Sequence, residues 1–235
     1  MYPVEKGRRI RPVAYIRTDF SEKFGIPRQS GLVPELLGKI VFEEEYRCEE
    51  ALREIEGFSH LWLIFDFSKA HRDEWSPTVR PPRFGGNRRI GVFASRSPFR
   101  PNSLGLSSVR LEGVEATEKD GTVLIVSGAD LLDMTPIYDI KPYIPYADCH
   151  ADATGGYTET VEKKVLAVDF PEELLKAVPG DKRKALVGCL SQDPRPSYQD
   201  DESRVYGMSF AGLDVRFRVC GDVLCVVGVE EKEKR

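Results

Sequence analysis

The sequence predicts a mainly β protein that ends in a small α+β domain. Short runs rich in Val, Ile and Phe recur along the chain, and Gly, Pro and Asp separate them. Two neighbouring helix-like stretches occur only after residue 165. A chain of 235 residues is long enough to bury a core without disulfides or metals, and it suits either one large β domain or one domain with a small appendix.

The expected strands follow one another closely. In the first two thirds of the chain they are RPVAYI, GKIVF, HLWLIFDF, RIGVFAS, SSVRLEGVE and TVLIVSG. In the last third they are KKVLAV, VRFRVCG and VLCVVGV. Their alternating or continuously apolar patterns are typical of strands with one or both faces buried.

Three helices are expected between these strands. The first covers about 47–57, where apolar side chains share one face and Gly57 follows as a stop. The second covers 171–178 and opens with Pro171 and acidic residues. Asp181 is expected to cap the third, KRKALVGCLSQ, which the following DPRP ends.

The chain divides into two expected domains. ADCHADATGGYTET at 147–160 is rich in Gly, Asp and Thr, which is typical of a connection. We therefore expect an N-terminal β domain over 1–160 and a small α+β domain over 161–235.

Composition limits the cellular setting. Five cysteines are an odd number with irregular spacing and no CxxC pair, which favours reduced thiols. The longest apolar run is far shorter than the roughly 20 residues that span a bilayer. The first residues, MYPVEKGRRIRPV, have no apolar stretch like that of a signal peptide. A cytoplasmic protein without a membrane segment is expected.

Several common enzyme motifs are missing from the sequence. No two glycines stand two apart, which excludes GxGxxG, and the Gly38-Lys39 pair is not followed by Ser or Thr, so there is no P-loop. GxSxG is absent and the three histidines are scattered. Neither Cys149-His150 nor Cys220-x4-Cys225 has the matching second pair of a zinc site, so no metal is expected.

The strongest local signal is an arginine strip at 78–111. It contains seven arginines, four prolines, no lysine and no acid. Residues 80–111 carry +7, whereas the other 203 residues carry −11, which gives the net charge of −4. Arginine grips phosphate and carboxylate bidentately and stacks on bases, so the strip favours an anionic ligand. The alternative is a solvated basic loop between acidic neighbours.

At this point the sequence resembles the TsaA-like (TrmO) family. The resemblance is carried by PRQSGL at 27–32, FSHLWLIFDF at 58–67, PTVRPP at 77–82, RRIGVFASRSPFRPNSLGLS at 88–107, TPIYDIKPYIPYAD at 135–148 and LSQDPRPSY at 190–198. It implies a β-barrel, a homodimer, and transfer of a methyl group from S-adenosyl-L-methionine to N6 of threonylcarbamoyladenosine in the tRNA anticodon loop. The C-terminal part resembles that of the bacterial branch.

The resemblance also implies which residues hold the cofactor. They are Gln29, Ser30, Gly31, Leu32, Ser68, Lys69, Arg96, Leu106, Ser108, Ala129, Asp130, Leu131 and Leu132. Arg96 is suited to a bidentate pair with the methionine carboxylate, and Asp130 is suited to face the positive amine or sulfonium. Family members often have His where this chain has Ser68, which makes that contact the least secure unless backbone groups form it.

The acceptor nitrogen is conjugated to the purine and to a carbonyl, so a base should help the transfer. Asp139 is the candidate proton acceptor, and Lys141 or Tyr143 is the candidate partner that polarises the carbonyl. The alternative is that Asp139 and Lys141 form only a structural ion pair. The candidate contacts to substrate are Arg88, Arg89, Phe99, Arg100 and Asn102. Phe99 and Tyr143 are candidate stacking platforms.

Two other functions remain open at this point. One is a non-catalytic RNA-binding module on the same barrel, which would bind no S-adenosylmethionine. The other is an enzyme acting on a small phosphorylated metabolite, which would turn over without RNA.

Overall fold

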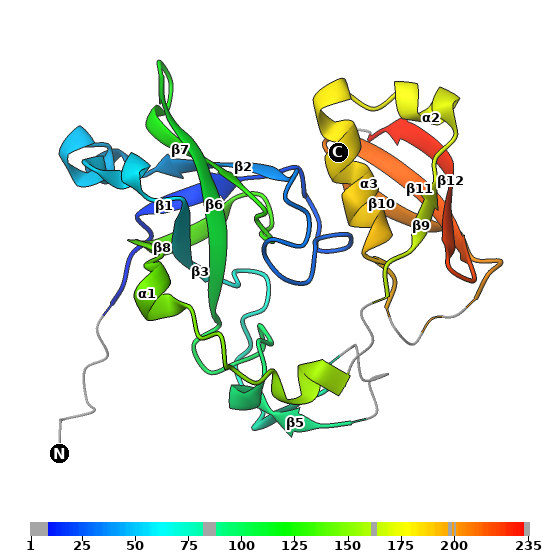
Figure 1. Cartoon of the computed structure of the whole chain (residues 1–235), viewed down its shortest axis with the longest axis horizontal. Helices are drawn as coiled ribbons and strands as arrows, with labels where there is room; N and C mark the ends of the chain where they lie inside the picture. The colour runs from blue at the N-terminus through cyan, green and yellow to red at the C-terminus, as the bar shows by residue number, and fades with distance from the viewer. Residues whose placement is uncertain (1–8, 82–87, 161–163, 197–198, 200, 233–235) are drawn as a thin grey trace.

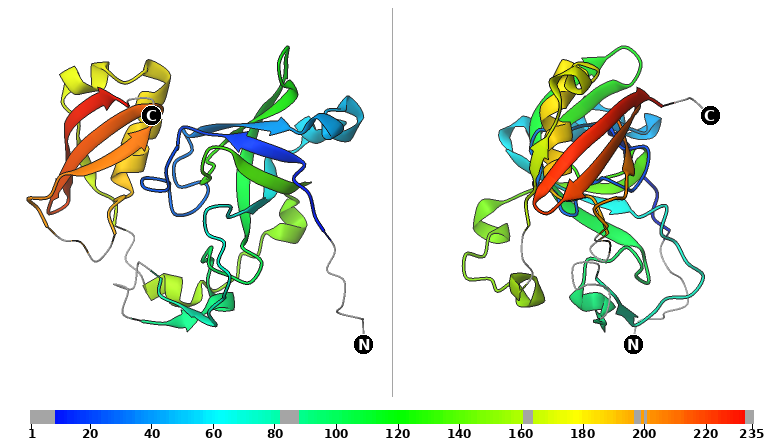
Figure 2. Two further views of the ribbon diagram at one scale, coloured as in Figure 1. Left: turned by 180° about the vertical axis from the view of Figure 1, so that it is seen from behind. Right: turned by 90° about the vertical axis from the view of Figure 1, so that its right-hand side faces the viewer.

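The computed structural model describes residues 9–81, 88–160, 164–196, 199 and 201–232. The first two thirds of the chain form one unit, at the left of Figure 1, and the last third forms a second unit at the right. Figure 2 shows the same division from behind. Within the described residues, no helix is long and apolar enough to cross a membrane.

Six strands of the first unit hydrogen-bond in a closed ring. They are β1 (Ala14–Arg17), β2 (Leu37–Phe42), β3 (His60–Asp66), β6 (Leu104–Thr117), β7 (Gly121–Ser127) and β8 (Thr135–Pro142). Their order is β1-β2-β7-β6-β3-β8, every neighbouring pair is antiparallel, and β8 closes on β1, which is the pairing of a closed barrel. Closure leaves no unpaired strand edge in the ring. The mainly β prediction is confirmed.

Alternation along the strands places the apolar core inside the ring. Leu61, Leu63 and Phe65 of β3 are almost fully buried there. Opposite Phe65 stands Gly105 of β6. A Cβ at Gly105 would lie 2.3 Å from Cζ of Phe65, so the ring of that phenylalanine occupies the space of the missing side chain.

Two sequence predictions in the first unit are wrong. The expected helix at 47–57 is instead a series of short 3-10 turns, Glu44–Tyr46, Glu49–Leu52 and Ile55–Gly57. Glu54 adopts a left-handed φ of 68°, which an α-helix does not tolerate. The run RIGVFAS is a strand only at Ile90–Gly91 (β5), which pairs with β4 (Thr78–Val79). Val92–Ala94 form a 3-10 turn.

The second unit is a sheet with two helices. Its strands are β9 (Ala167–Asp169), β10 (Tyr206–Phe210), β11 (Leu213–Cys220) and β12 (Val223–Glu231), in the order β10-β11-β12-β9. The expected helices are present as α2 (Glu172–Lys176) and α3 (Arg183–Ser191). Asp181 does not cap α3, because it lies in a 3-10 turn and no side chain caps the helix.

Short helical segments lie between the two units. The expected connection at 147–160 begins in α1 (Pro145–Asp148) and ends in a 3-10 turn over Gly156–Thr160. The residues between these two elements contain no strand.

A segment of the first unit enters the core of the second. Residues 18–36 connect β1 to β2, and their loop extends toward α3 and β10 in Figure 1. Phe20, Val33 and Leu36 are at most 3% exposed and belong to the same apolar cluster as Leu186 and Phe210. The core of the C-terminal unit is therefore completed by N-terminal residues.

We predict that Gly105→Ala lowers the free energy of unfolding by about 1–3 kcal/mol, because the new methyl group overlaps the Phe65 ring. Gly113→Ala is the matched control on the same strand, since a Cβ there meets nothing within 4 Å. Urea unfolding followed by circular dichroism measures both. Equal stability of the two variants would show that Phe65 moves aside without cost.

Candidate functional site

The loop at 29–32 lies against the turn that follows β7. The amide of Gly31 donates to the carbonyl of Gly128 at 2.8 Å, and the amide of Gly128 donates to the carbonyl of Leu36 at 2.9 Å. Gly31 and Gly128 have φ values of 78° and 72°, which favour glycine. A Cβ at Gly128 would lie 3.1 Å from Cα of Gly31. Glycine at 128 is therefore favoured both by its φ and by the close approach of the two backbones, whereas Gly31 is favoured by its φ alone, because a Cβ there would meet nothing within 4 Å.

A half-buried carboxylate lies beside this loop. Oδ1 of Asp130 accepts a hydrogen bond from the hydroxyl of Ser107 at 2.6 Å. Burial raises the pKa of Asp130, while the Ser107 hydrogen bond, backbone hydrogen bonds that include Ser30, and the charge of Arg96 oppose that rise. Nη1 of Arg96 donates to Oε1 of Gln29 at 2.6 Å. The structure thus brings four sequence-predicted residues, Gln29, Ser30, Arg96 and Asp130, to one place.

Ser107 was missed by the sequence reasoning. It is the last residue of the LGLS block, whereas the resemblance implies its neighbours Leu106 and Ser108 as cofactor contacts. Side chains alternate along β6, so Ser107 is buried and faces Asp130, while Leu106 and Ser108 lie on the opposite face. The two-residue period of the strand predicts that Ser107 lies on the face opposite to that of Leu106 and Ser108, which is the face toward Asp130.

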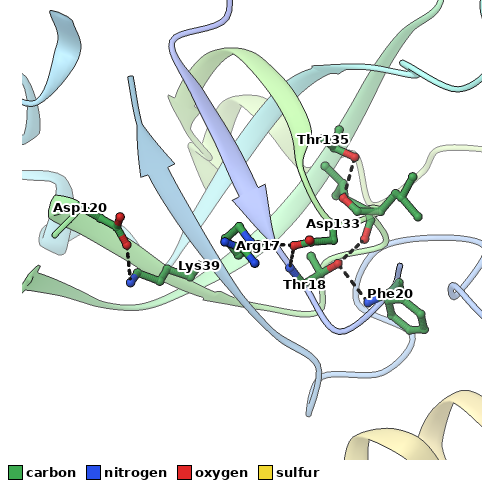
Figure 3. A network of polar contacts seen from close by, with 9 residues as sticks. Arg17, Thr18, Phe20, Lys39, Asp120, Asp133 and Thr135 are labelled. Atoms are coloured by element: carbon green, nitrogen blue, oxygen red, sulfur yellow. Dashed lines mark hydrogen bonds and ion pairs between the residues drawn. The ribbon is translucent and has the colours of Figure 1, made fainter. Parts of the chain in front are cut away.

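The turn at 129–133 is held by the network in Figure 3. Oδ1 of Asp133 accepts from Nε of Arg17 and from the amide of Thr18, both at 3.0 Å. The hydroxyl of Thr18 donates to the carbonyl of Leu131 at 3.0 Å. Ala129 and Leu131 are at most 3% exposed, and their side chains pack into the apolar core of the first unit. Leu132 is half-buried, and its carbonyl accepts from the hydroxyl of Thr135.

Ser68 and Lys69 follow the end of β3. The carbonyl of Lys69 accepts from Nζ of Lys23 at 2.6 Å. Although the chain lacks a histidine at 68, an imidazole is present nearby, since Nε2 of His71 lies 2.7 Å from Oδ1 of the buried Asp66. The sequence did not indicate this pair, because a turn between Asp66 and His71 brings the two side chains together.

A second group of predicted residues lies on the outer face of the ring. Leu106, Ile64 and Asp139 stand in one row across β6, β3 and β8, and Ser108, Trp62 and Lys141 stand in the next. Directly opposed residues of antiparallel strands share a face. Leu106 is 55% exposed there. In the part of the chain that the structure describes, no hydrogen bond or ion pair joins this face to the Asp130 group.

The three candidate catalytic residues lie on or next to this outer face. Nζ of Lys141 is 2.9 Å from Oδ2 of Asp139, and the two side chains are 61% and 47% exposed. The ion pair expected as the alternative is therefore present, and the carboxylate is also accessible. Tyr143 follows β8, and its ring centroid lies 5.6 Å from that of Trp62. Partial burial, then the neighbouring Cys149 and Asp148, raise the pKa of Tyr143.

Two arginines of the strip donate to neutral acceptors, whereas Arg110 pairs with Glu112 at 3.4 Å. Nε of Arg89 donates to the hydroxyl of Thr78 at 2.7 Å, and Nη1 of Arg100 donates to the carbonyl of Ser95 at 2.9 Å. The guanidinium of Arg72 lies 3.7 Å from the centroid of the Phe99 ring. Arg88 and Asn102 are exposed. Residues 82–87 of the strip lie outside the described residues.

Two further exposed aromatic residues were missed. Trp75 and Phe93 are 55% and 75% exposed, and their ring centroids are 6.4 Å apart. Exposed aromatic rings beside arginines are typical of surfaces that stack unpaired bases. Trp75 lies outside the arginine strip in sequence, in an acidic stretch, so composition concealed it.

Among the described residues, no group of three or more His, Cys, Asp or Glu side chains is arranged to hold a metal ion. The polar groups that converge at the loop are instead one arginine, one half-buried acid and backbone amides. Such a set fits an organic ligand that carries both a carboxylate and a positive charge.

Comparison with known proteins supports a single family for both units. The family model described as tRNA-methyltransferase O N-terminal domain matches residues 15–149, and the TrmO C-terminal domain model matches residues 163–232. The chain is 40% identical over 215 residues to the tRNA (adenine(37)-N6)-methyltransferase of Escherichia coli K12. The matched region covers 88% of this chain and 91% of that protein.

Two Pseudomonas aeruginosa proteins are also similar. A putative S-adenosylmethionine-dependent methyltransferase, RcsF, is 44% identical over 216 residues, with 88% of this chain and 91% of that protein covered. A crystal structure of TrmO from this organism matches with a TM-score of 0.79 and 36% identity, and covers 98% of this chain and 100% of that chain.

We predict that Ser107→Ala raises the pKa of Asp130 further, because the hydroxyl that stabilises its charged form is lost. Because its pKa is raised in the folded state, the protonated carboxyl stabilises the fold at pH values below its usual pKa, and this stabilisation is lost as pH rises through the raised pKa. The variant has a still higher pKa, so its stability should fall over a wider pH range. Carbon-13 NMR titration of the carboxyl measures the shift.

Ser203→Ala is the control for this titration, since Ser203 donates to the carboxylate of Asp201 in the C-terminal unit. It should leave the pKa of Asp130 unchanged. An unchanged Asp130 titration in Ser107→Ala would refute the assigned hydrogen bond.

Proposed function

The chain belongs to the tRNA-methyltransferase O family, and we propose that it transfers the methyl group of S-adenosylmethionine to N6 of threonylcarbamoyladenosine beside the tRNA anticodon. The observation that carries the proposal is the convergence of Gln29, Ser30, Arg96 and Asp130 at one loop. These residues come from three separate stretches of the sequence, and all were expected to hold this cofactor.

The residues at the loop fit the charges of the cofactor. Arg96 is exposed and suited to a bidentate pair with the methionine carboxylate. Asp130 faces the positive end, because a cation beside a half-buried carboxylate offsets the cost of its burial. When bound, S-adenosylmethionine supplies an electrophilic methyl group. Ser107 and the amide of Gly31 hold the two sides of the site in place.

Methyl transfer requires a base on the acceptor side. The carbon–sulfur bond breaks as the bond from carbon to N6 forms, and the proton of N6 leaves to a base. Asp139 fills that role, since its carboxylate is accessible and Lys141 holds its orientation at 2.9 Å. Lys141 or Tyr143 polarises the carbonyl conjugated to N6.

The arginine strip and its aromatic neighbours bind the anticodon loop. Arg88, Arg89, Arg100 and Asn102 contact phosphates or the threonyl carboxylate, and Phe99 stacks a base while Arg72 lies against its other side. The exposed Trp75 and Phe93 offer a second pair of rings for stacking.

The remaining parts of the proposal concern organisation. The catalytic β-barrel domain covers 1–160 and the C-terminal domain covers 161–235. The proposal that the protein is a homodimer rests on the family resemblance alone. It works in the cytoplasm, which is supported by five free cysteines.

Mass spectrometry of modified nucleosides tests the activity. Transfer RNA that carries threonylcarbamoyladenosine is incubated with the protein, with and without S-adenosylmethionine. We expect a mass gain of one methyl group on that nucleoside only when the cofactor is present. No gain would refute the proposal, and cofactor binding by calorimetry would then separate an RNA-binding module from an inactive enzyme.

We predict that Asp139→Asn lowers the rate of methyl transfer by about 10²- to 10⁴-fold, because the amide accepts no proton. Affinity for tRNA and for the cofactor should stay within about twofold. Asp120→Asn is the control, since it breaks the Asp120–Lys39 ion pair elsewhere in the ring. A wild-type rate in Asp139→Asn would show that the pair with Lys141 is structural only.

A further inference from the structure

The block LSQDPRPSY at 190–198 has no role in the function described above. Its described residues begin in the last turn of α3 and continue to Pro196. The amide of Asp193 donates to the carbonyl of Leu190, and Asp193 adopts a left-handed φ of 49°. The chain therefore turns sharply at the end of the helix.

A bidentate ion pair fixes this turn. Nε and Nη2 of Arg195 lie 2.9 and 3.0 Å from the two carboxylate oxygens of Asp193. Arg195 is only 7% exposed. A buried guanidinium persists only with such a partner, so the pair fixes the path of the backbone at Arg195.

The fixed backbone holds the residue that precedes the cofactor loop. The carbonyl of Arg195 accepts from Nη2 of Arg28 at 2.9 Å. The next residue, Gln29, accepts from Arg96 at 2.6 Å. A continuous path of contacts thus runs from Asp193 in the C-terminal unit to the arginine that faces the cofactor carboxylate.

The other end of the loop is held by packing. Val33 is 2% exposed and belongs to the core cluster of the C-terminal unit. A Cβ at Gly188 of α3 would lie 2.7 Å from Cγ1 of Val33, so the helix has no side chain where the loop docks. Between these two anchors, Gln29, Gly31 and Leu32 are exposed.

We propose that the Asp193–Arg195 turn is a positioning element for the cofactor loop: through Arg28 it holds Gln29–Leu32 in the conformation that receives S-adenosylmethionine. The inference rests on the proposed function, because it concerns the same cofactor site. It assigns the C-terminal unit a part in cofactor affinity that is separate from any contact with RNA. Arg28, Asp193 and Arg195 act through the loop and touch no reacting atom.

The test uses the full-length chain with Arg28→Met, Asp193→Asn and both together. Cofactor affinity is measured by calorimetry without tRNA, and tRNA affinity is measured without cofactor. We expect Arg28→Met to weaken cofactor binding about threefold to tenfold, because the loop loses the hydrogen bond that orders it but the cofactor loses no direct contact. Asp193→Asn should weaken cofactor binding about twofold to fivefold. Because both residues act on the same loop, the cofactor affinity of the double variant should lie within about twofold of that of Arg28→Met.

Kinetics separate positioning from general damage. The KM for the cofactor should rise with the dissociation constant, whereas kcat at saturating cofactor and affinity for tRNA should change less than about twofold. Arg28→Lys keeps a charged donor and should restore part of the affinity. Arg183→Met is the matched control, because Arg183 also donates to a backbone carbonyl, that of Val178, within the C-terminal unit.

Three results would overturn the inference. Cofactor affinity of both single variants within twofold of wild type would show that the turn does not position the loop. Additive losses in the double variant would show that Asp193 acts independently of Arg28. A loss confined to tRNA affinity would make the block an RNA contact. If the wild-type protein itself bound no S-adenosylmethionine, the proposed function would fail as well, and that result is distinct from the other three.

Discussion

The burial of the β1–β2 connection in the C-terminal core is the constraint on which the rest of the structure depends. Phe20 meets Phe210 edge to face at 5.5 Å, and Val33 and Leu36 fill the same cluster from the other end of the connection. Burying three such side chains contributes roughly 1.5–3 kcal/mol each. Because this core is shared, neither unit has its complete set of buried side chains without the other. The loop at 29–32 is the part of the connection that stays at the surface, and its two ends are fixed by the packing around it.

The candidate cofactor site follows from this arrangement. The same connection carries Thr18, which holds the carbonyl of Leu131, and Phe20, whose carbonyl accepts from the amide of Asp133. Asp19 forms an ion pair with Lys182 of the C-terminal unit at 2.7 Å. One segment therefore fixes the turn at 129–133, the loop at 29–32 and the position of the C-terminal unit. A site built in this way is ordered before its ligand arrives, which reduces the entropy lost on binding.

The sequence was sufficient for the parts of the protein that depend on local pattern. Strand periodicity located eight of the strands, and the helices at 171–178 and after Asp181 were found because their apolar faces and flanking Pro and Gly are local signals. The helix at 47–57 failed because a left-handed Glu54 interrupts it, and propensity does not reveal such a residue. Ser107, the Asp66–His71 pair and the Trp75–Phe93 pair were missed because each depends on a strand face or on a turn that brings distant side chains together.

Three arginines of the strip donate to uncharged groups, whereas Arg110 pairs with the carboxylate of Glu112 at 3.4 Å. Arg89 donates to a hydroxyl, Arg96 to an amide oxygen and Arg100 to backbone carbonyls. A carboxylate partner would orient each guanidinium equally well but would cancel its potential. At Arg89, Arg96 and Arg100, neutral acceptors therefore order the side chain and leave its positive charge available to an incoming anion. Because residues 80–111 carry +7 while the other 203 residues carry −11, that potential is concentrated on one part of the chain. A protein of net charge −4 can in this way favour a few phosphates of one folded RNA loop over nucleic acid in general.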